Sequence, residues 1–141
     1  VLGPDAANTG EYALRHREYD ARWRTGVRSY TAWIEALRDT DNLGQARWHS
    51  NVVYQLGINR RSAVRYLRAM AARNSGEVAD HVGRAVKRYE SVLQTLTRAD
   101  TSQDAMMSKA GRDALVQVIE EIVELETAAA ADMDRAAAAL N

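Results

Sequence analysis

The sequence predicts an all-α protein, in the form of an antiparallel four-helix bundle with up-down-up-down topology. The only proline is Pro4, so no proline interrupts a helix beyond it. The residues that follow are mostly good helix formers, and their apolar members recur at three- and four-residue steps rather than alternating as in a strand. A chain of 141 residues has the size of one domain. We therefore expect residues 1–10 to be an irregular lead-in and residues 11–141 to form a single helical bundle domain.

The first two helices are expected to occupy the N-terminal half of the domain. The first begins at about Glu11 or Tyr19 and ends at Asp39, and the turn that follows supplies a cap for the next helix. Its apolar stripe consists of Tyr19, Trp23, Val27, Tyr30, Ile34 and Leu37. The second helix is expected from Leu43 to Arg73, where the sequence Asn-Ser-Gly ends it. Its inward residues are expected to be Val52, Leu56, Ala63, Leu67 and Met70.

The last two helices should complete the bundle. The third is expected from Glu77 to Thr97, and the fourth from about Gln103 or Arg112 to Leu140. The apolar stripe of the third consists of Val78, Val82, Val86, Tyr89, Leu93 and Leu96. The fourth has near-heptad spacing and a second half that is almost all alanine, with Leu115, Val118, Ile122, Leu125, Ala129, Ala136 and Leu140 on one stripe. Short connections favour antiparallel neighbours, which predicts the up-down-up-down arrangement.

Composition excludes several classes of function. The chain has no cysteine, so it has neither a disulfide, nor a thiolate metal site, nor a cysteine nucleophile. No apolar stretch approaches the roughly 20 residues that span a bilayer, and no signal peptide is visible. We therefore expect a cytoplasmic location and no membrane partner. The first residue is Val1 rather than Met, which leaves open whether a catalytic domain precedes this chain.

Charge is balanced overall but divided along the chain. There are 19 basic and 19 acidic residues, yet from Glu11 to Ser75 basic residues exceed acidic ones by 12 to 6, and beyond Ser75 acidic residues exceed basic ones by 12 to 7. Arg60, Arg61, Arg65 and Arg68 form a cationic ridge on the second helix, which could meet an anion or a nucleic-acid backbone. Acidic partners on the third and fourth helices explain this ridge as well, so no nucleic-acid partner is expected.

Three segments carry a family resemblance. Residues 25–37 resemble a G-x-x-x-Y-x-x-W-x-x-x-L helix, residues 60–67 an R-x-x-A-x-x-(F/Y)-L helix, and residues 85–89 an A-x-x-x-Y helix, followed by a long Glu- and Ala-rich one. In this order they resemble the helical C-terminal part of bacterial proteins whose N-terminal half has a papain-like or butirosin-type acyltransferase fold (C39-peptidase-like). The likeness covers about residues 20–140. It implies an accessory helical domain, or a stand-alone relative, that binds or shapes a site, because the family's catalytic cysteine and histidine are expected in the N-terminal half.

The aromatic residues predict a binding site. There is no Phe, and eight of the nine Trp and Tyr residues lie between Tyr12 and Tyr66. Trp and Tyr combine an apolar ring with a hydrogen-bonding tip, which suits either a pocket for a small amphipathic ligand or core packing. Gly26 would leave a gap beside them. We expect a small molecule or short peptide between the first two helices, held by Trp23, Tyr30, Trp33, Trp48, His49, Tyr54, Asn59, Arg60 and Tyr66.

Two other classes of function remain as alternatives. A structural or protein-interaction module would associate through the Ala-rich fourth helix, with another chain or with a second copy as a homodimer, and Ala129, Met133, Ala136 and Leu140 would be the contact line. An enzyme would need a catalytic constellation, and the sequence has no Gly-x-Ser-x-Gly elbow, Gly-rich phosphate loop or Glu-x-x-His pair. We therefore expect no enzymatic activity, no metal site and no cofactor.

Overall fold

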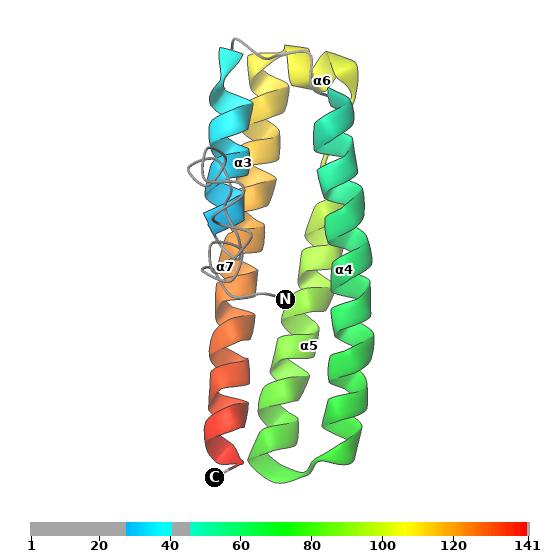
Figure 1. The fold of residues 1–141 in the computed structure, drawn as a ribbon, viewed down its shortest axis with the longest axis vertical. Helices are drawn as coiled ribbons and strands as arrows, with labels where there is room; N and C mark the ends of the chain where they lie inside the picture. Colours follow the sequence, from blue (N-terminus) through cyan, green and yellow to red (C-terminus); the bar gives the residue numbers. More distant parts are fainter. Residues whose placement is uncertain (1–27, 41–45, 141) are drawn as a thin grey trace, which may run out of the picture.

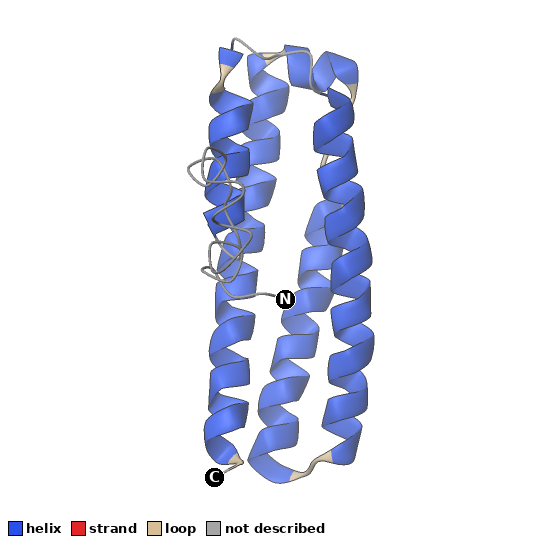
Figure 2. Ribbon diagram, viewed as in Figure 1, coloured by secondary structure: helices blue, strands red, loops and turns tan. Residues whose placement is uncertain are grey.

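The computed structural model describes residues 28–40 and 46–140, and most of these residues are helical. Within this part of the chain five helices follow one another, joined by short connections, and there is no strand (Figures 1 and 2). They are α3 (Arg28–Arg38), α4 (Ala46–Arg73), α5 (Gly76–Leu96), α6 (Gln103–Met107) and α7 (Lys109–Ala139). The predicted all-α class is confirmed. The part of the first predicted helix before Arg28 lies outside the described residues.

Helices α4, α5 and α7 run the length of the molecule, and consecutive ones point in opposite directions (Figure 1). Helix α3 is shorter and packs against the upper half of α7, and α6 lies at the top of the molecule, where it contacts α7 and α4. Helix α5 packs against both α4 and α7. No described helix is long and apolar enough to cross a membrane.

The fourth predicted helix is interrupted at Ser108. The Ser108 hydroxyl accepts a hydrogen bond from the backbone N–H of Gly111 at 2.9 Å, which caps the start of α7. Glycine at position 111 is required by space, because a Cβ there would lie 2.2 Å from the carbonyl oxygen of Ala105 in α6. One continuous helix starting at about Gln103 or Arg112 was predicted. The structure has two helices instead, and α6 begins at Gln103 whereas α7 begins at Lys109.

The core consists of two clusters along the bundle axis. The upper cluster joins α3, α4, α5, α6 and α7 and contains large side chains, among them Tyr30, Trp33, Leu37, Met106, Ile119 and Ile122. The lower cluster joins α4, α5 and α7, has no buried aromatic residue, and consists of one leucine, three valines and three alanines: Val64, Leu67, Val82, Ala85, Val86, Ala129 and Ala136. Most predicted apolar stripes face these clusters, but Leu140 is 68% exposed.

Candidate functional site

Two predicted binding residues meet between α3 and α4. The Trp33 indole Nε1–H donates a hydrogen bond of 3.0 Å to Nδ1 of His49, and both side chains are buried. Because Nδ1 accepts this bond, the proton of a neutral His49 ring is on Nε2. Burial lowers the pKa of His49, which favours this neutral form. The ring of Trp48 contacts His49 edge-on, with 5.0 Å between ring centroids.

A second buried contact links four helices through Arg60 of α4. Its guanidinium donates two hydrogen bonds to the carboxylate of Glu126 on α7, one from Nε to Oε1 and one of 2.9 Å from Nη2 to Oε2. The same Nη2 lies 3.4 Å from the hydroxyl of Tyr30 on α3. The guanidinium carbon lies 5.6 Å from the centre of the Tyr89 ring, within range of a cation–π contact. Arg60 therefore ties α4 to α3, α5 and α7.

The ionisation of this group follows from its surroundings. Burial raises the pKa of Tyr30, and the negative charge of Glu126 raises it further. For Arg60, burial lowers the pKa, but the hydrogen bonds with Glu126 and its negative charge outweigh this and leave the pKa above its ordinary value. The tyrosine is therefore neutral and the arginine charged at any physiological pH.

These contacts place Tyr30, Trp33, His49 and Arg60 in the interior. Within the described part of the chain, every buried side-chain nitrogen and oxygen has a hydrogen-bond partner. Four of the predicted binding residues thus form two buried contacts, in which they use their polar atoms on one another and on Glu126. A ligand at this position would have to displace existing bonds.

The other predicted binding residues lie apart from this group. Trp48, Tyr54 and Tyr66 are exposed by 45%, 62% and 66% on the outside of α4, and Asn59 is exposed beside them. Trp23 lies outside the described residues. The predicted set is therefore divided into a buried half and a half on the outer surface of one helix.

The outer surface of α4 has an unusual composition. The helix carries six arginines and no aspartate or glutamate. Arg47, Tyr54, Arg61 and Arg68 recur at seven-residue intervals, so they lie along one stripe of the helix, with Arg65 beside them. We call these five residues the α4 stripe. Arg68 pairs with Glu90 of α5, whereas Arg47, Arg61 and Arg65 make no ion pair with any described residue.

A groove lies beside the α4 stripe, between α4 and α5. It has a volume of about 520 Å³, with Ile58, Val64 and Leu93 as its apolar lining. The arginines that line it are Arg61, Arg65 and Arg68. The groove thus offers apolar contact next to guanidinium groups, two of which are free of ion pairs within the described chain.

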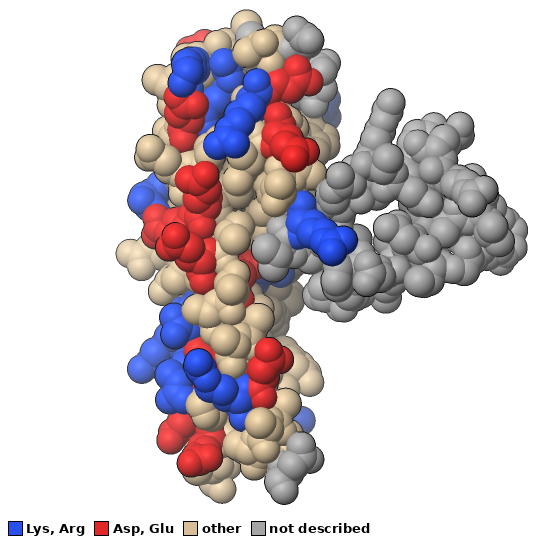
Figure 3. Space-filling model, turned by 90° about the vertical axis from the view of Figure 1, so that its left-hand side faces the viewer, with Lys and Arg blue, Asp and Glu red and all other residues tan. Residues whose placement is uncertain are grey.

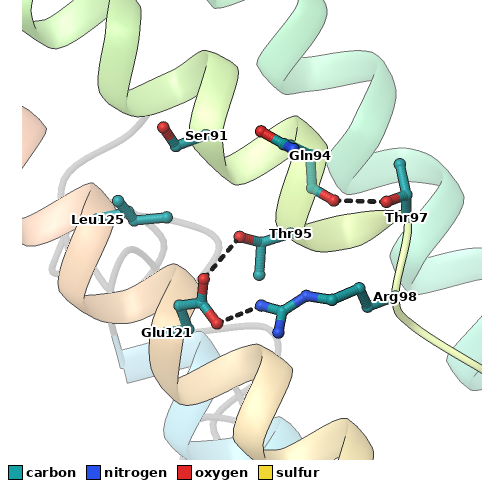
Figure 4. A pocket seen from close by; sticks show the side chains of 7 residues that line it. All are labelled: Ser91, Gln94, Thr95, Thr97, Arg98, Glu121 and Leu125. Carbon is teal, nitrogen blue, oxygen red and sulfur yellow. Dashed lines mark hydrogen bonds and ion pairs between the residues drawn. The ribbon is translucent and has the colours of Figure 1, made fainter.

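A second cavity, of about 490 Å³, lies between the upper parts of α5 and α7 (Figure 4). Its polar side chains are largely paired with one another. The Thr95 hydroxyl donates a 3.0 Å hydrogen bond to Glu121, and Arg98 forms an ion pair with the same carboxylate. Thr97 donates to the carbonyl oxygen of Gln94. These bonds leave few groups for a ligand, so this cavity is a weaker candidate than the α4 stripe.

Two buried acidic residues of α7, Glu126 and Asp132, were not among the residues predicted from the sequence. The signal for Glu126 was present in the sequence, because it lies four residues after Ile122 and three before Ala129, on the buried stripe. In the described residues no three His, Asp or Glu side chains lie close enough together to hold a metal ion.

The sequence and structure were compared with known protein families, curated proteins and solved structures, and no significant match was found among any of them. The resemblance to the helical part of papain-like or butirosin-type acyltransferase-fold proteins accordingly stays a prediction.

Proposed function

We propose that this chain is a non-enzymatic binding domain that docks an acidic segment of a protein along the α4 stripe. The observation that supports the proposal is the composition of α4, a helix with six arginines and no acidic residue that exposes Trp48, Tyr54 and Tyr66. The proposed site therefore lies on the outside of α4 and not between the first two helices. Of the residues expected to form the inner pocket, Tyr30, Trp33, His49 and Arg60 lie in the interior.

The composition favours a protein partner over a nucleic acid. Protein interfaces are enriched in Tyr, Trp and Arg and depleted in Lys, Asp and Glu, and α4 contains none of these three. The groove beside the stripe adds the apolar surface that the side chains of a peptide would contact. A nucleic-acid backbone would need only the charges.

The dimensions of α4 fit a segment of several turns. Its 28 residues span about 42 Å at a rise of about 1.5 Å per residue. Arginines at seven-residue spacing match carboxylates at the same spacing on an antiparallel helix. We regard the domain that carries the α4 stripe as a four-helix up-down-up-down bundle, in which α6 belongs to the connection between α5 and α7.

Self-association through α7 is less favoured. Ala129 and Ala136, which were expected to contact a second chain, are 0% and 3% exposed because they pack inside the lower core cluster. Of that contact line, Leu140 is exposed.

The proposal is tested with a synthetic acidic helix. The probe is a fluorescein-labelled 21-residue peptide with Glu and Leu at heptad spacing, and its binding to the full chain is followed by fluorescence anisotropy. We expect the Arg61→Gln/Arg65→Gln double variant to bind about tenfold more weakly. The control is Arg38→Gln/Lys109→Gln, which removes the same charge from exposed positions elsewhere and should bind normally.

Two results would contradict the proposal. Equal losses in both double variants would indicate a nonspecific charge effect. A single-stranded oligonucleotide of the same length that binds more tightly than the peptide, through the same two arginines, would replace the protein partner with a nucleic acid.

A further inference from the structure

Three arginines converge on one buried carboxylate in the lower half of the molecule. Asp132 of α7 is fully buried, and Nε of Arg88 donates a 2.7 Å hydrogen bond to its Oδ2. Its Oδ1 accepts from Nε of Arg84 at 3.4 Å and from Nη1 of Arg135 at 3.2 Å. Arg84 and Arg88 belong to α5, and Arg135 lies one turn beyond Asp132 on α7. The cluster therefore lies where these two helices meet.

The charges in this cluster do not balance. One carboxylate faces three guanidinium groups, and the hydrogen bond from Arg88 keeps the pKa of Asp132 below its ordinary value, so the carboxylate is ionised at neutral pH. Two positive charges remain uncompensated within the cluster. On the α7 side of the molecule, several basic side chains lie in the lower half, with acidic side chains among and below them (Figure 3).

Neutralising a buried carboxylate does not require three arginines. Glu126, also buried and on the same helix, is satisfied by the two hydrogen bonds from Arg60 alone. At Asp132, Arg84 and Arg88 instead use Nε, the inner nitrogen of the guanidinium group. Nη2 of Arg84 contacts Nδ1 of His81, and the Nη groups of Arg88 have no hydrogen-bond partner in the described chain. These outer donors of Arg84 and Arg88 thus stay free or contact the ring of His81.

The three arginine side chains also reach solvent. Those of Arg84, Arg88 and Arg135 are 47%, 38% and 61% exposed, whereas that of Asp132 is 1% exposed. A buried anion therefore holds three cations that also reach water, Arg84 and Arg88 through the inner nitrogen Nε and Arg135 through Nη1. Holding like charges together in this way is unfavourable unless a further anion joins them, and planar guanidinium groups are well suited to phosphate oxygens.

We propose that Arg84, Arg88 and Arg135 form a binding site for a doubly charged phosphate group, with Asp132 holding them in position. Two negative charges on the ligand match the two uncompensated charges of the cluster. The site contains no residue of α4, so it is independent of the docking surface proposed above. The phosphate could be free or carried as an ester on a larger molecule.

The test measures the Nε–Hε signals of these arginines by NMR in the full chain. Inorganic phosphate and phenyl phosphate are titrated at pH 7.5 and constant ionic strength. We expect saturable shifts of the Arg84, Arg88 and Arg135 signals. In the Arg84→Gln/Arg135→Gln double variant, which leaves Arg88 bonded to Asp132, the response of Arg88 should weaken at least about tenfold. The Arg38→Gln/Lys109→Gln control should respond as the unmodified chain does.

The two probes separate the two sources of the phosphate. Tighter binding of phenyl phosphate supports an esterified ligand, and equal or tighter binding of inorganic phosphate supports the free anion. Linear, non-saturating shifts with both probes would overturn the proposal, as would an equal loss in the control variant. Circular dichroism and the melting temperature of each variant establish that a lost response does not come from unfolding.

Discussion

The guanidinium of Arg60 and the carboxylate of Glu126 face each other across the interior with two parallel hydrogen bonds, although 66 residues separate them in the sequence. The side chains are only 19% and 9% exposed. Each of these buried charges depends on the other, because removing one side chain leaves its partner buried without a counter-charge.

Replacing Glu126 by Gln should therefore destabilise the protein strongly. The loss of the carboxylate leaves the Arg60 guanidinium without its counter-charge, and we expect the free energy of unfolding to fall by about 3 kcal/mol. Urea denaturation at pH 7 measures this. The control is Arg68→Gln, which breaks the exposed pair with Glu90 and should cost less than about 1 kcal/mol. Similar losses in the two variants would mean that the Arg60–Glu126 contact is not specially stabilising.

Replacement of Trp33 and of Tyr54 by alanine should have different effects on stability and on peptide binding. Trp33 is 4% exposed and Tyr54 62%. Trp33→Ala leaves a cavity and an unpaired His49 Nδ1, so we expect a loss of about 3–5 kcal/mol in unfolding free energy. Tyr54→Ala should change stability by no more than about 0.5 kcal/mol while weakening peptide binding. A Trp33→Ala variant that stays stable but loses binding would instead support the predicted ligand site between the first two helices.

Stability should fall in mildly acidic solution because of His49. Its pKa is lowered in the folded state by burial, so the unfolded chain takes up a proton first as the pH decreases. The contribution of the buried neutral His49 to the free energy of unfolding is therefore complete above the unfolded pKa of about 6.5, and it is lost as the pH falls below that value. Urea unfolding at pH 7.5, 6.5 and 5.5 should show this decrease. His49→Asn, which keeps an acceptor for Trp33 but does not titrate, should have a shallower pH dependence. An unchanged slope would assign the effect to other groups.

Two glycines provide a matched pair of substitutions. At Gly111 a Cβ would meet the backbone of Ala105 at 2.2 Å, whereas at Gly83 in α5 it would meet nothing within 4 Å. Gly111→Ala must push α6 away from α7, and we expect it to lower the melting temperature, at a cost of about 1–3 kcal/mol. Gly83→Ala should raise it, by about 0.5–1 kcal/mol in stability, because alanine is the better helix former. Scanning calorimetry measures both, and a stable Gly111→Ala variant would indicate that the Ser108 turn yields easily.

The helices were predictable because their signals are local. Helix periodicity and the absence of proline between Glu11 and Leu140 depend on neighbouring residues only. The interruption at Ser108 was harder to foresee, since it depends on a hydroxyl capping α7 and on the close approach of Gly111 to the backbone of Ala105.

The candidate site was less predictable because exposure depends on how the helices assemble. Trp33 and Tyr54 are both aromatic residues within helices, and only the position of α7 and α5 beside them decides which is buried. Asp132 illustrates the same limit. Its partners Arg84 and Arg88 precede it by more than 40 residues, and no periodicity in α7 alone reveals that they meet.

The alanine-rich end of α7 implies a gradient of local opening along the bundle. Ala129 and Ala136 bury little surface each, whereas Ile119 and Ile122 higher on the same helix bury large side chains. Separating the lower helices therefore costs less free energy than separating the upper ones. Backbone amide hydrogens near Ala136 should exchange with deuterium well before those near Ile119, so the molecule would begin to unfold at the end that carries Asp132 and its three arginines.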